Sequence, residues 1–189
     1  MKKFNDYDKV QVYAERERLP IGGYILKILN AEEKSYDWGS VLLISFDIAD
    51  GDYEGFYKDD YKNQQQEDKK WKGNIRVNLP KDDGSEKDSW TKRGFKTVIQ
   101  AIEDSNNGFH WDWNEKKLKD KLIGGLFRNK EYEYNGKTGF FTECCKLIAV
   151  ENIKSGKFKI PGDKLLNSSN STDNTYGTNP SDPSDDLPF

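Results

Sequence analysis

The stretch SVLLISFDIAD, residues 40–50, decides the expected fold. Apolar side chains occupy every second position from Leu42 to Ile48, which is the period of a β-strand with one face in a core. The preceding stretch GGYILKILNAEE, residues 22–33, has apolar side chains at adjacent as well as alternate positions, as a strand buried on both faces has. The sequence therefore predicts a domain built mainly of strands.

The residues that follow predict a third strand after a loop. Asp50-Gly51 is a turn signal, and we expect YEGFYKDDY, residues 53–61, to pair as a hairpin with the strand before it. The polar residues 62–70 are expected to form a loop that interrupts or extends the third strand. That strand is expected in WKGNIRVNLP, residues 71–80, where apolar side chains alternate again.

One helix and a second hairpin complete the expected elements. Residues 91–108 carry apolar side chains at helical spacing and end in a glycine, and these side chains are Phe95, Val98, Ile99 and Ile102. Two further strands are expected at residues 124–134 and 139–153. Asn135-Gly136 lies between them, and this dipeptide strongly favours a tight hairpin turn.

Three strands, a helix and two strands is the element order of the OB-fold, a five-stranded Greek-key barrel, although other five-stranded barrels share this order. We therefore expect an all-β fold with one helix, an OB-fold five-stranded Greek-key barrel followed by a disordered acidic C-terminal tail. The expected boundaries are a charged N-terminal extension at residues 1–18, the OB-fold domain at 19–162 and the tail at 163–189.

Composition changes sharply after Leu166. Residues 167–189 contain four Asp, no Lys or Arg and only three large apolar side chains, too few to offset the entropy lost on ordering, so we expect disorder there. The whole chain has 30 Lys and Arg against 33 Asp and Glu. Residues 115–166 hold 12 basic and 7 acidic side chains, a bias well below that of strongly basic nucleic-acid-binding domains.

The sequence contains neither an apolar run of membrane-spanning length nor a recognisable signal peptide, so a cytoplasmic protein is expected. Catalytic motifs are also missing. His110 is the only histidine, and we expect it to pack among the aromatic residues of FHWDW. The adjacent cysteines Cys144 and Cys145 have no second pair to complete a zinc site and are expected to be small hydrophobic residues in a strand. We expect no enzyme, cofactor or metal.

Aromatic and basic side chains alternate in several expected strands and loops. In a solvent-facing groove this pattern suits single-stranded nucleic acid, because bases stack on rings while Lys and Arg follow the phosphates. Partial burial with a polar tip in water would explain any single Trp or Tyr equally well. The candidate stacking rings are Tyr36, Trp38, Tyr57, Trp71, Tyr132 and Tyr134. The candidate phosphate contacts are Lys58, Lys72, Arg76, Arg128, Lys130 and Lys137.

The last five residues, DDLPF, resemble the terminus of bacterial and phage single-stranded DNA-binding proteins, in which an acidic linker ends in a few Asp, an apolar residue, Pro and Phe. The segments PIGGYILKI, FDIADGDYEG and KLIGGLFRNKEYEYNGKTGFF are similar to phage replication proteins of this class from hosts with low-GC genomes. The acidic run is shorter than in the best-known members of the family, since Asp182 stands apart.

This resemblance implies a division of labour. The OB domain would coat single strands without sequence preference in replication, recombination and repair, in the bacterial cell or a phage-infected host. The tail tip would dock into basic, apolar-lined pockets of replication and recombination proteins, through Asp185, Asp186, Leu187, Pro188 and Phe189. A solubilising tail without a partner is the plainer interpretation.

Three other functions stay open at this point. An annealing or recombination mediator would use the same single-strand contacts. A carbohydrate-binding β domain would also expose Trp and Tyr, because sugars stack on flat rings. A metal-dependent nuclease could use the adjacent acids Asp59-Asp60 or Asp82-Asp83 to hold Mg²⁺, although adjacent acids usually point apart.

Overall fold

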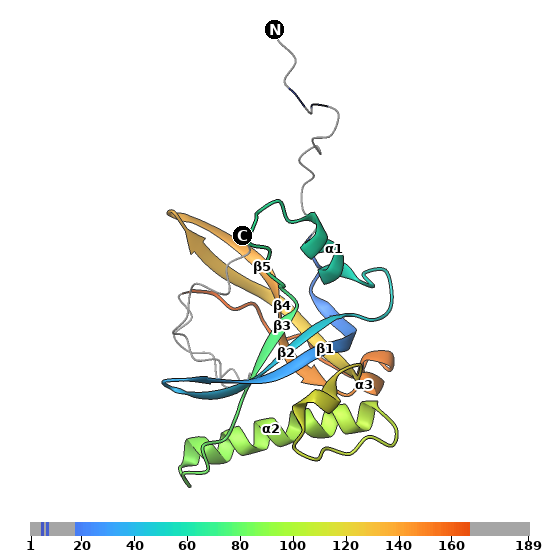
Figure 1. The fold of residues 1–189 in the computed structure, drawn as a ribbon, viewed down its shortest axis with the longest axis vertical. Helices are drawn as coiled ribbons and strands as arrows, with labels where there is room; N and C mark the ends of the chain where they lie inside the picture. Colours follow the sequence, from blue (N-terminus) through green and yellow to red (C-terminus); the bar gives the residue numbers. More distant parts are fainter. Residues whose placement is uncertain (1–4, 6, 8–17, 167–189) are drawn as a thin grey trace.

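The computed structural model describes residues 18–166, together with Asn5 and Tyr7. Its centre is one five-stranded antiparallel sheet with the strand order β3-β2-β1-β4-β5 (Figure 1). The edge strands β3 and β5 approach to within 8 Å between Cα atoms, so the sheet curls towards a barrel. The strands are β1 (Gly22–Tyr36), β2 (Gly39–Ile48), β3 (Asn74–Asn78), β4 (Leu122–Tyr134) and β5 (Lys137–Ile148).

Strand β1 pairs with two different neighbours along its length. Its first residues, 22–27, pair with β4, whereas residues 26–36 pair with β2, and the register shifts between Ile28 and Asn30. A shift of this kind bends a strand and increases its twist. Beyond Phe127, β4 therefore has β5 on one side and no β1 on the other.

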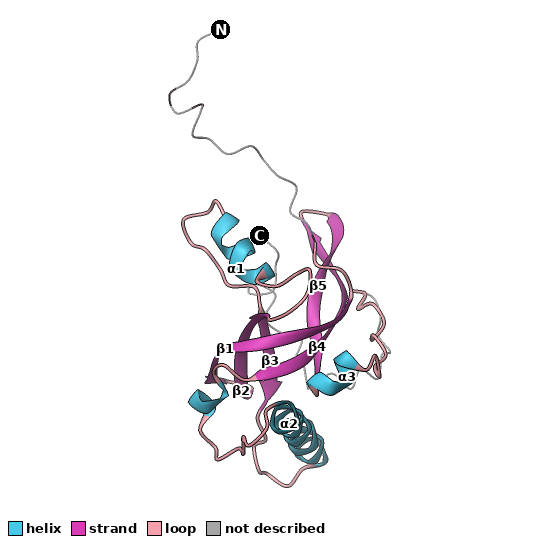
Figure 2. Ribbon diagram, turned by 90° about the vertical axis from the view of Figure 1, so that its right-hand side faces the viewer, coloured by secondary structure: helices cyan, strands magenta, loops and turns pink. Residues whose placement is uncertain are grey.

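Helices lie at both ends of the sheet (Figure 2). Helix α1 (Phe56–Asn63) lies at one end and α2 (Glu86–Ser105) at the other, with a short 3₁₀ helix η1 (Glu115–Leu118) and α3 (Val150–Lys154) near α2. Helix α2 connects β3 to β4 as predicted, but the expectation of a single helix is wrong, because α1 lies between β2 and β3 and α3 follows β5.

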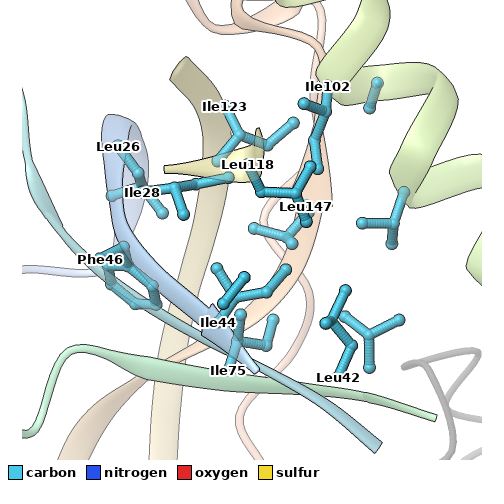
Figure 3. Packing of buried hydrophobic residues seen from close by; sticks show 14 of the residues in the cluster. Leu26, Ile28, Leu42, Ile44, Phe46, Ile75, Ile102, Leu118, Ile123 and Leu147 are labelled. Atoms are coloured by element: carbon cyan, nitrogen blue, oxygen red, sulfur yellow. The ribbon is translucent and has the colours of Figure 1, made fainter. Parts of the chain in front are cut away.

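Helix α2 closes its end of the sheet with an aliphatic face. The four apolar residues predicted for this face are all buried, and Ile102 lies against Leu118, Ile123 and Leu147 in the core (Figure 3). The helix begins five residues earlier than predicted, because the hydroxyl of Ser85 accepts the backbone N–H of Asp88 and caps the first turn. The α1 end is aromatic, with the edges of its rings directed at neighbouring faces, as between Phe46 and Tyr57.

The expected hairpin between residues 40–50 and 53–61 is wrong. Residues 56–63 form helix α1, which starts after Gly55 in a left-handed conformation (φ 75°). The Asp47 carboxylate, buried in β2, accepts the backbone N–H groups of Tyr57 and Lys58 in the first turn of that helix. These bonds satisfy donors that a helix start leaves without partners, and β2 pairs with β1 instead.

The C-terminal part of the domain differs from expectation in two ways. The last strand ends at Ile148 and not at residue 153, because α3 turns back over the sheet and Ile153 packs where Gly23 and Gly124 carry no side chain. The folded domain also extends past the expected boundary at residue 162. Lys164 forms a parallel bridge with Lys130 of β4.

Replacing Asp47 by Ala should lower the free energy of unfolding by about 1–3 kcal/mol, because buried N–H groups at the start of α1 would lose their acceptor. Urea unfolding measures this. Asp50→Ala is the matched control, since the Asp50 carboxylate is exposed to solvent and accepts only the N–H of Gly51. Equal loss of stability in both variants would mean that Asp47 does not hold α1.

Candidate functional site

Beyond the residues that pair with β1, β4 and β5 continue as a two-stranded arm joined at Asn135-Gly136, and the predicted hairpin is confirmed. The turn fixes a register in which Tyr134 lies opposite Lys137 and Tyr132 opposite Gly139. Alternate residues of a strand share a face, so five of the predicted contacts lie on one side of the arm. We call this side the arm face, and it carries Arg128, Lys130, Tyr132, Tyr134 and Lys137, together with Phe141 and Glu143.

The middle of the arm face is an aromatic pair with a cation over it. The ring centres of Tyr132 and Phe141 are 6.1 Å apart, and the Lys130 ammonium lies 5.3 Å from the Phe141 ring centre. A Cβ atom at Gly139 would lie 2.8 Å from the Tyr132 ring, so the glycine makes room for that ring. The sequence prediction did not include Phe141, although the turn at Asn135-Gly136 determines that Phe141 faces Lys130.

Arg128 belongs to the interior of the arm, and its prediction as a phosphate contact is wrong. Its side chain is 3% exposed, and its Nε donates to Oε1 of Glu143 at 3.0 Å. The second oxygen of Glu143 lies 3.4 Å from the Lys130 ammonium. One carboxylate therefore fixes the positions of both cations at the base of the arm.

The tip of the β1–β2 hairpin carries a second aromatic pair. Tyr36 and Trp38 lie parallel, with ring centres 5.1 Å apart and an angle of 5° between planes. Both side chains are half-buried. The arm and this tip point to the same side of the molecule, the left side of Figure 1. The structure therefore brings the predicted rings of the hairpin tip and those of the arm to one side of the sheet.

Tyr57 is a core residue, and its prediction as a stacking ring is wrong. It is 6% exposed and packs edge-on against Phe46 and Phe56, at 5.5 and 5.3 Å between ring centres. Burial raises the pKa of its hydroxyl well above the usual value. Lys58, the next residue in α1, is exposed to solvent.

Trp71 is half-buried just before β3, where backbone carbonyls hold it in place. Its indole N–H lies 3.2 Å from the carbonyl oxygen of Phe46 and 3.1 Å from that of Gly73. Tyr61 of α1 packs beside it at 5.9 Å, a neighbour that the sequence prediction did not include. Lys72 and Arg76 are half-buried near and within β3. These residues form a separate group from the arm face.

The backbone of residues 163–166 runs along the edge of β4 that β1 leaves open. Glu131 donates its N–H to the Lys164 carbonyl at 2.8 Å, and Lys164 donates to the Asn129 carbonyl at 2.9 Å. The described part of the chain therefore ends beside the arm. The predicted docking residues Asp185, Asp186, Leu187, Pro188 and Phe189 lie outside the described residues, as does most of the expected tail.

The adjacent acids do not converge within the described part of the chain. Asp59 pairs with Lys62, and Asp82 pairs with Lys92. No group of three or more His, Cys, Asp or Glu that could hold a metal ion occurs in residues 18–166. His110 is exposed and not packed as expected, whereas Cys144 and Cys145 lie in β5 as expected.

No helix in the described range is long and apolar enough to cross a membrane. No protein-family model matches the chain, and no curated protein sequence matches it.

Arg128→Met should destabilise the protein by roughly 3 kcal/mol, because it leaves Glu143 without its main partner in a mostly buried position. Lys137→Met on the exposed end of the arm face should change stability little. Thermal or urea unfolding measures both. If the two variants unfold alike, Arg128 does not carry the ion pair that holds the base of the arm.

Proposed function

We propose that this protein is a non-enzymatic single-stranded DNA-binding protein with an OB-fold, which coats exposed strands during replication or recombination. The observation that carries the proposal is the arm face. There Lys130, Tyr132, Tyr134 and Lys137 share one side of a protruding hairpin, next to Phe141.

The strand order supports the OB-fold. In a five-stranded Greek-key barrel of this type, a helix follows the third strand, and the loops after strands one and four border the ligand face. Here α2 follows β3, and β1 lies between β2 and β4. The two loops in question are the Tyr36–Trp38 tip and the tip of the arm. Both carry candidate stacking rings.

The chemistry of these two tips suits a flexible polyanion with flat bases. An aromatic ring stacks on any base, so such contacts need no particular sequence. Ammonium groups neutralise phosphates along the backbone. Lys130 is engaged with Glu143 and Phe141, so Lys137 at the exposed end of the arm face is the better placed cation for a first phosphate contact.

The C-terminal residues supply the second half of the proposal. Leu187, Pro188 and Phe189 offer a small apolar wedge, and Asp185 and Asp186 offer carboxylates to Arg or Lys of a partner. Because residues 163–166 are paired with β4, the tail starts at the arm. A tethered tip of this kind raises the effective concentration of its partner near the bound strand.

We expect the full chain to bind homopolymeric single-stranded DNA, with an affinity that falls as salt rises by about 0.7 log units per log unit for each phosphate neutralised. Tyr132→Ala and Tyr134→Ala should each weaken binding by roughly 1–3 kcal/mol. Quenching of Trp fluorescence during titration measures the affinity.

Phe140→Ala is the matched control, because Phe140 is 41% exposed on the opposite side of the same arm. The affinity of the Phe140→Ala variant for single-stranded DNA should equal that of the unaltered chain. Binding to a soluble glycan and not to oligonucleotides would favour a carbohydrate-binding domain, for which the parallel Tyr36–Trp38 pair is a suitable platform. If the protein also anneals complementary strands, the result would favour an annealing or recombination mediator.

Removing Phe189 alone should abolish capture of replication and recombination proteins while leaving DNA affinity unchanged, because the apolar anchor is lost and the side-chain charge is not. The fold should stay intact even when every residue after Leu166 is deleted, because the core cluster lies in residues 19–147. Pull-down with purified partners measures capture. Recovery of the same partners without Phe189 would contradict docking by the tail tip.

A further inference from the structure

The outer side of α2 and the loop after it expose two tryptophans. Trp90 is 58% exposed and Trp113 is 76% exposed. Single exposed apolar residues are common, but Trp is the largest side chain and is usually mostly buried. Neither residue belongs to the ring pairs on the left side of Figure 1. These two rings therefore call for an explanation separate from the arm face.

Each tryptophan is held in place by a neighbour from α2. The Arg93 guanidinium lies 5.6 Å from the centre of the Trp90 ring, and a shallow pocket is lined by Glu86, Ser89, Trp90 and Arg93. Trp113 stacks on Phe95, with ring centres 6.0 Å apart and an angle of 20° between planes. Both rings make these contacts while much of their surface stays open to solvent.

The backbone at Trp113 is strained. Its φ is 65°, a left-handed conformation that costs an ordinary side chain roughly 1–2 kcal/mol and that Gly, Asn or Asp adopts more easily. The other non-glycine residues of this kind are Asp82, Asp120 and Asn135 among the described residues. Burial does not compensate the strain at Trp113, because the ring is mostly exposed. Strained positions of this kind concentrate at binding sites.

The charges on this side of α2 favour an anion. Lys92 is neutralised by Asp82 and Asp88, and Lys117 by Asp112. In contrast, Arg93 and Lys96 pair with no carboxylate within residues 18–166. Glu86 is the one acid among the residues that line the pocket. Helical spacing puts Arg93 and Lys96 on the exposed side of the helix, between Trp90 and the Phe95–Trp113 stack.

This surface is connected to the proposed strand-binding side. Leu79, directly after β3 on the connection to α2, donates its N–H to the Ser40 carbonyl at 2.9 Å, next to the tip of the β1–β2 hairpin. The Lys81 side chain covers Gly39, where an added Cβ would lie 3.2 Å from its Cε. In Figure 1 the hairpin tip and the start of α2 lie on the same side of the molecule. A strand that leaves Tyr36 and Trp38 can therefore pass over Lys81 to α2.

We propose that Trp90, Arg93, Lys96 and Trp113, the α2 face, form a second contact site for the same single strand after it leaves the β1–β2 tip. The inference rests on the proposed function. Bases stack on the two exposed rings, and Arg93 and Lys96 contact phosphates between them. The arm face and the β1–β2 tip alone accommodate a short oligonucleotide, and only a longer strand reaches the α2 face.

The test compares two oligothymidylates on the full chain. The short one has about 10 nucleotides, within the roughly 4–16 that one OB domain covers, and the long one is about three times that length. Trp90→Ala and Trp113→Ala should each weaken binding of the long oligomer about five- to 100-fold and leave the short one unchanged. Arg93→Gln should reduce the salt slope of the long oligomer by about 0.7.

The charge control is Lys157→Gln, an exposed cation after α3 that lies outside the proposed path. It should behave like the unaltered chain, and thermal unfolding checks that each variant is folded. If the unaltered chain binds neither oligomer, the proposed function itself is wrong. If it binds both and the α2 variants keep its ratio of affinities, only the second site is wrong.

Two further outcomes would also overturn the proposal. If Trp90→Ala and Trp113→Ala weaken binding of both lengths equally, these rings belong to the same contact site as the arm face and the β1–β2 tip. Unchanged DNA binding combined with lost self-association, measured by sedimentation, would make the α2 face a protein–protein surface.

Discussion

The divided pairing of β1 is the constraint on which the rest of the structure depends. One strand must hydrogen-bond to β4 through its first half and to β2 through its second half, and the register shift between Ile28 and Asn30 allows the change of partner. Once β1 turns away, β4 and β5 continue without it as the arm. The same bend of β1 carries the β1–β2 tip outward on that side of the sheet. The two candidate contact surfaces thus share one structural cause.

Polar side chains are buried in this domain where helix α1 and the loop after it cover one end of the sheet. The buried carboxylate of Asp47 caps α1 at the aromatic end, and the buried side chain of Gln64 ties down the loop after α1 through both backbone groups of Lys70. Buried polar atoms are tolerated when their hydrogen bonds are made. Both residues fix polar segments that contribute little apolar surface of their own.

The elements that were predicted correctly are those determined by residues close together in the sequence. Alternation found the strands, the spacing of Phe95 and Ile102 found α2, and Asn135-Gly136 found the second hairpin. The prediction of a strand at residues 53–61 failed because α1 depends on a hydrogen bond to Asp47, a tertiary contact that no local window contains. Long-range partners also explain the failures at Arg128 and Tyr57, since basic or aromatic type does not reveal burial. The shared side of Lys130, Tyr132 and Phe141 follows from the turn register and could have been predicted.

The parallel stack of Tyr36 and Trp38 has a consequence for the entropy of binding. An exposed side chain that becomes fixed in a complex loses rotamer freedom, at about 0.5–1.5 kcal/mol for each residue immobilised. Here the two rings already restrain each other at 5.1 Å in the free protein. Most of that freedom is lost when the hairpin folds and not when a ligand arrives. A flat ligand that lies on the outer ring therefore meets a rigid surface, and more of its stacking energy remains available as affinity.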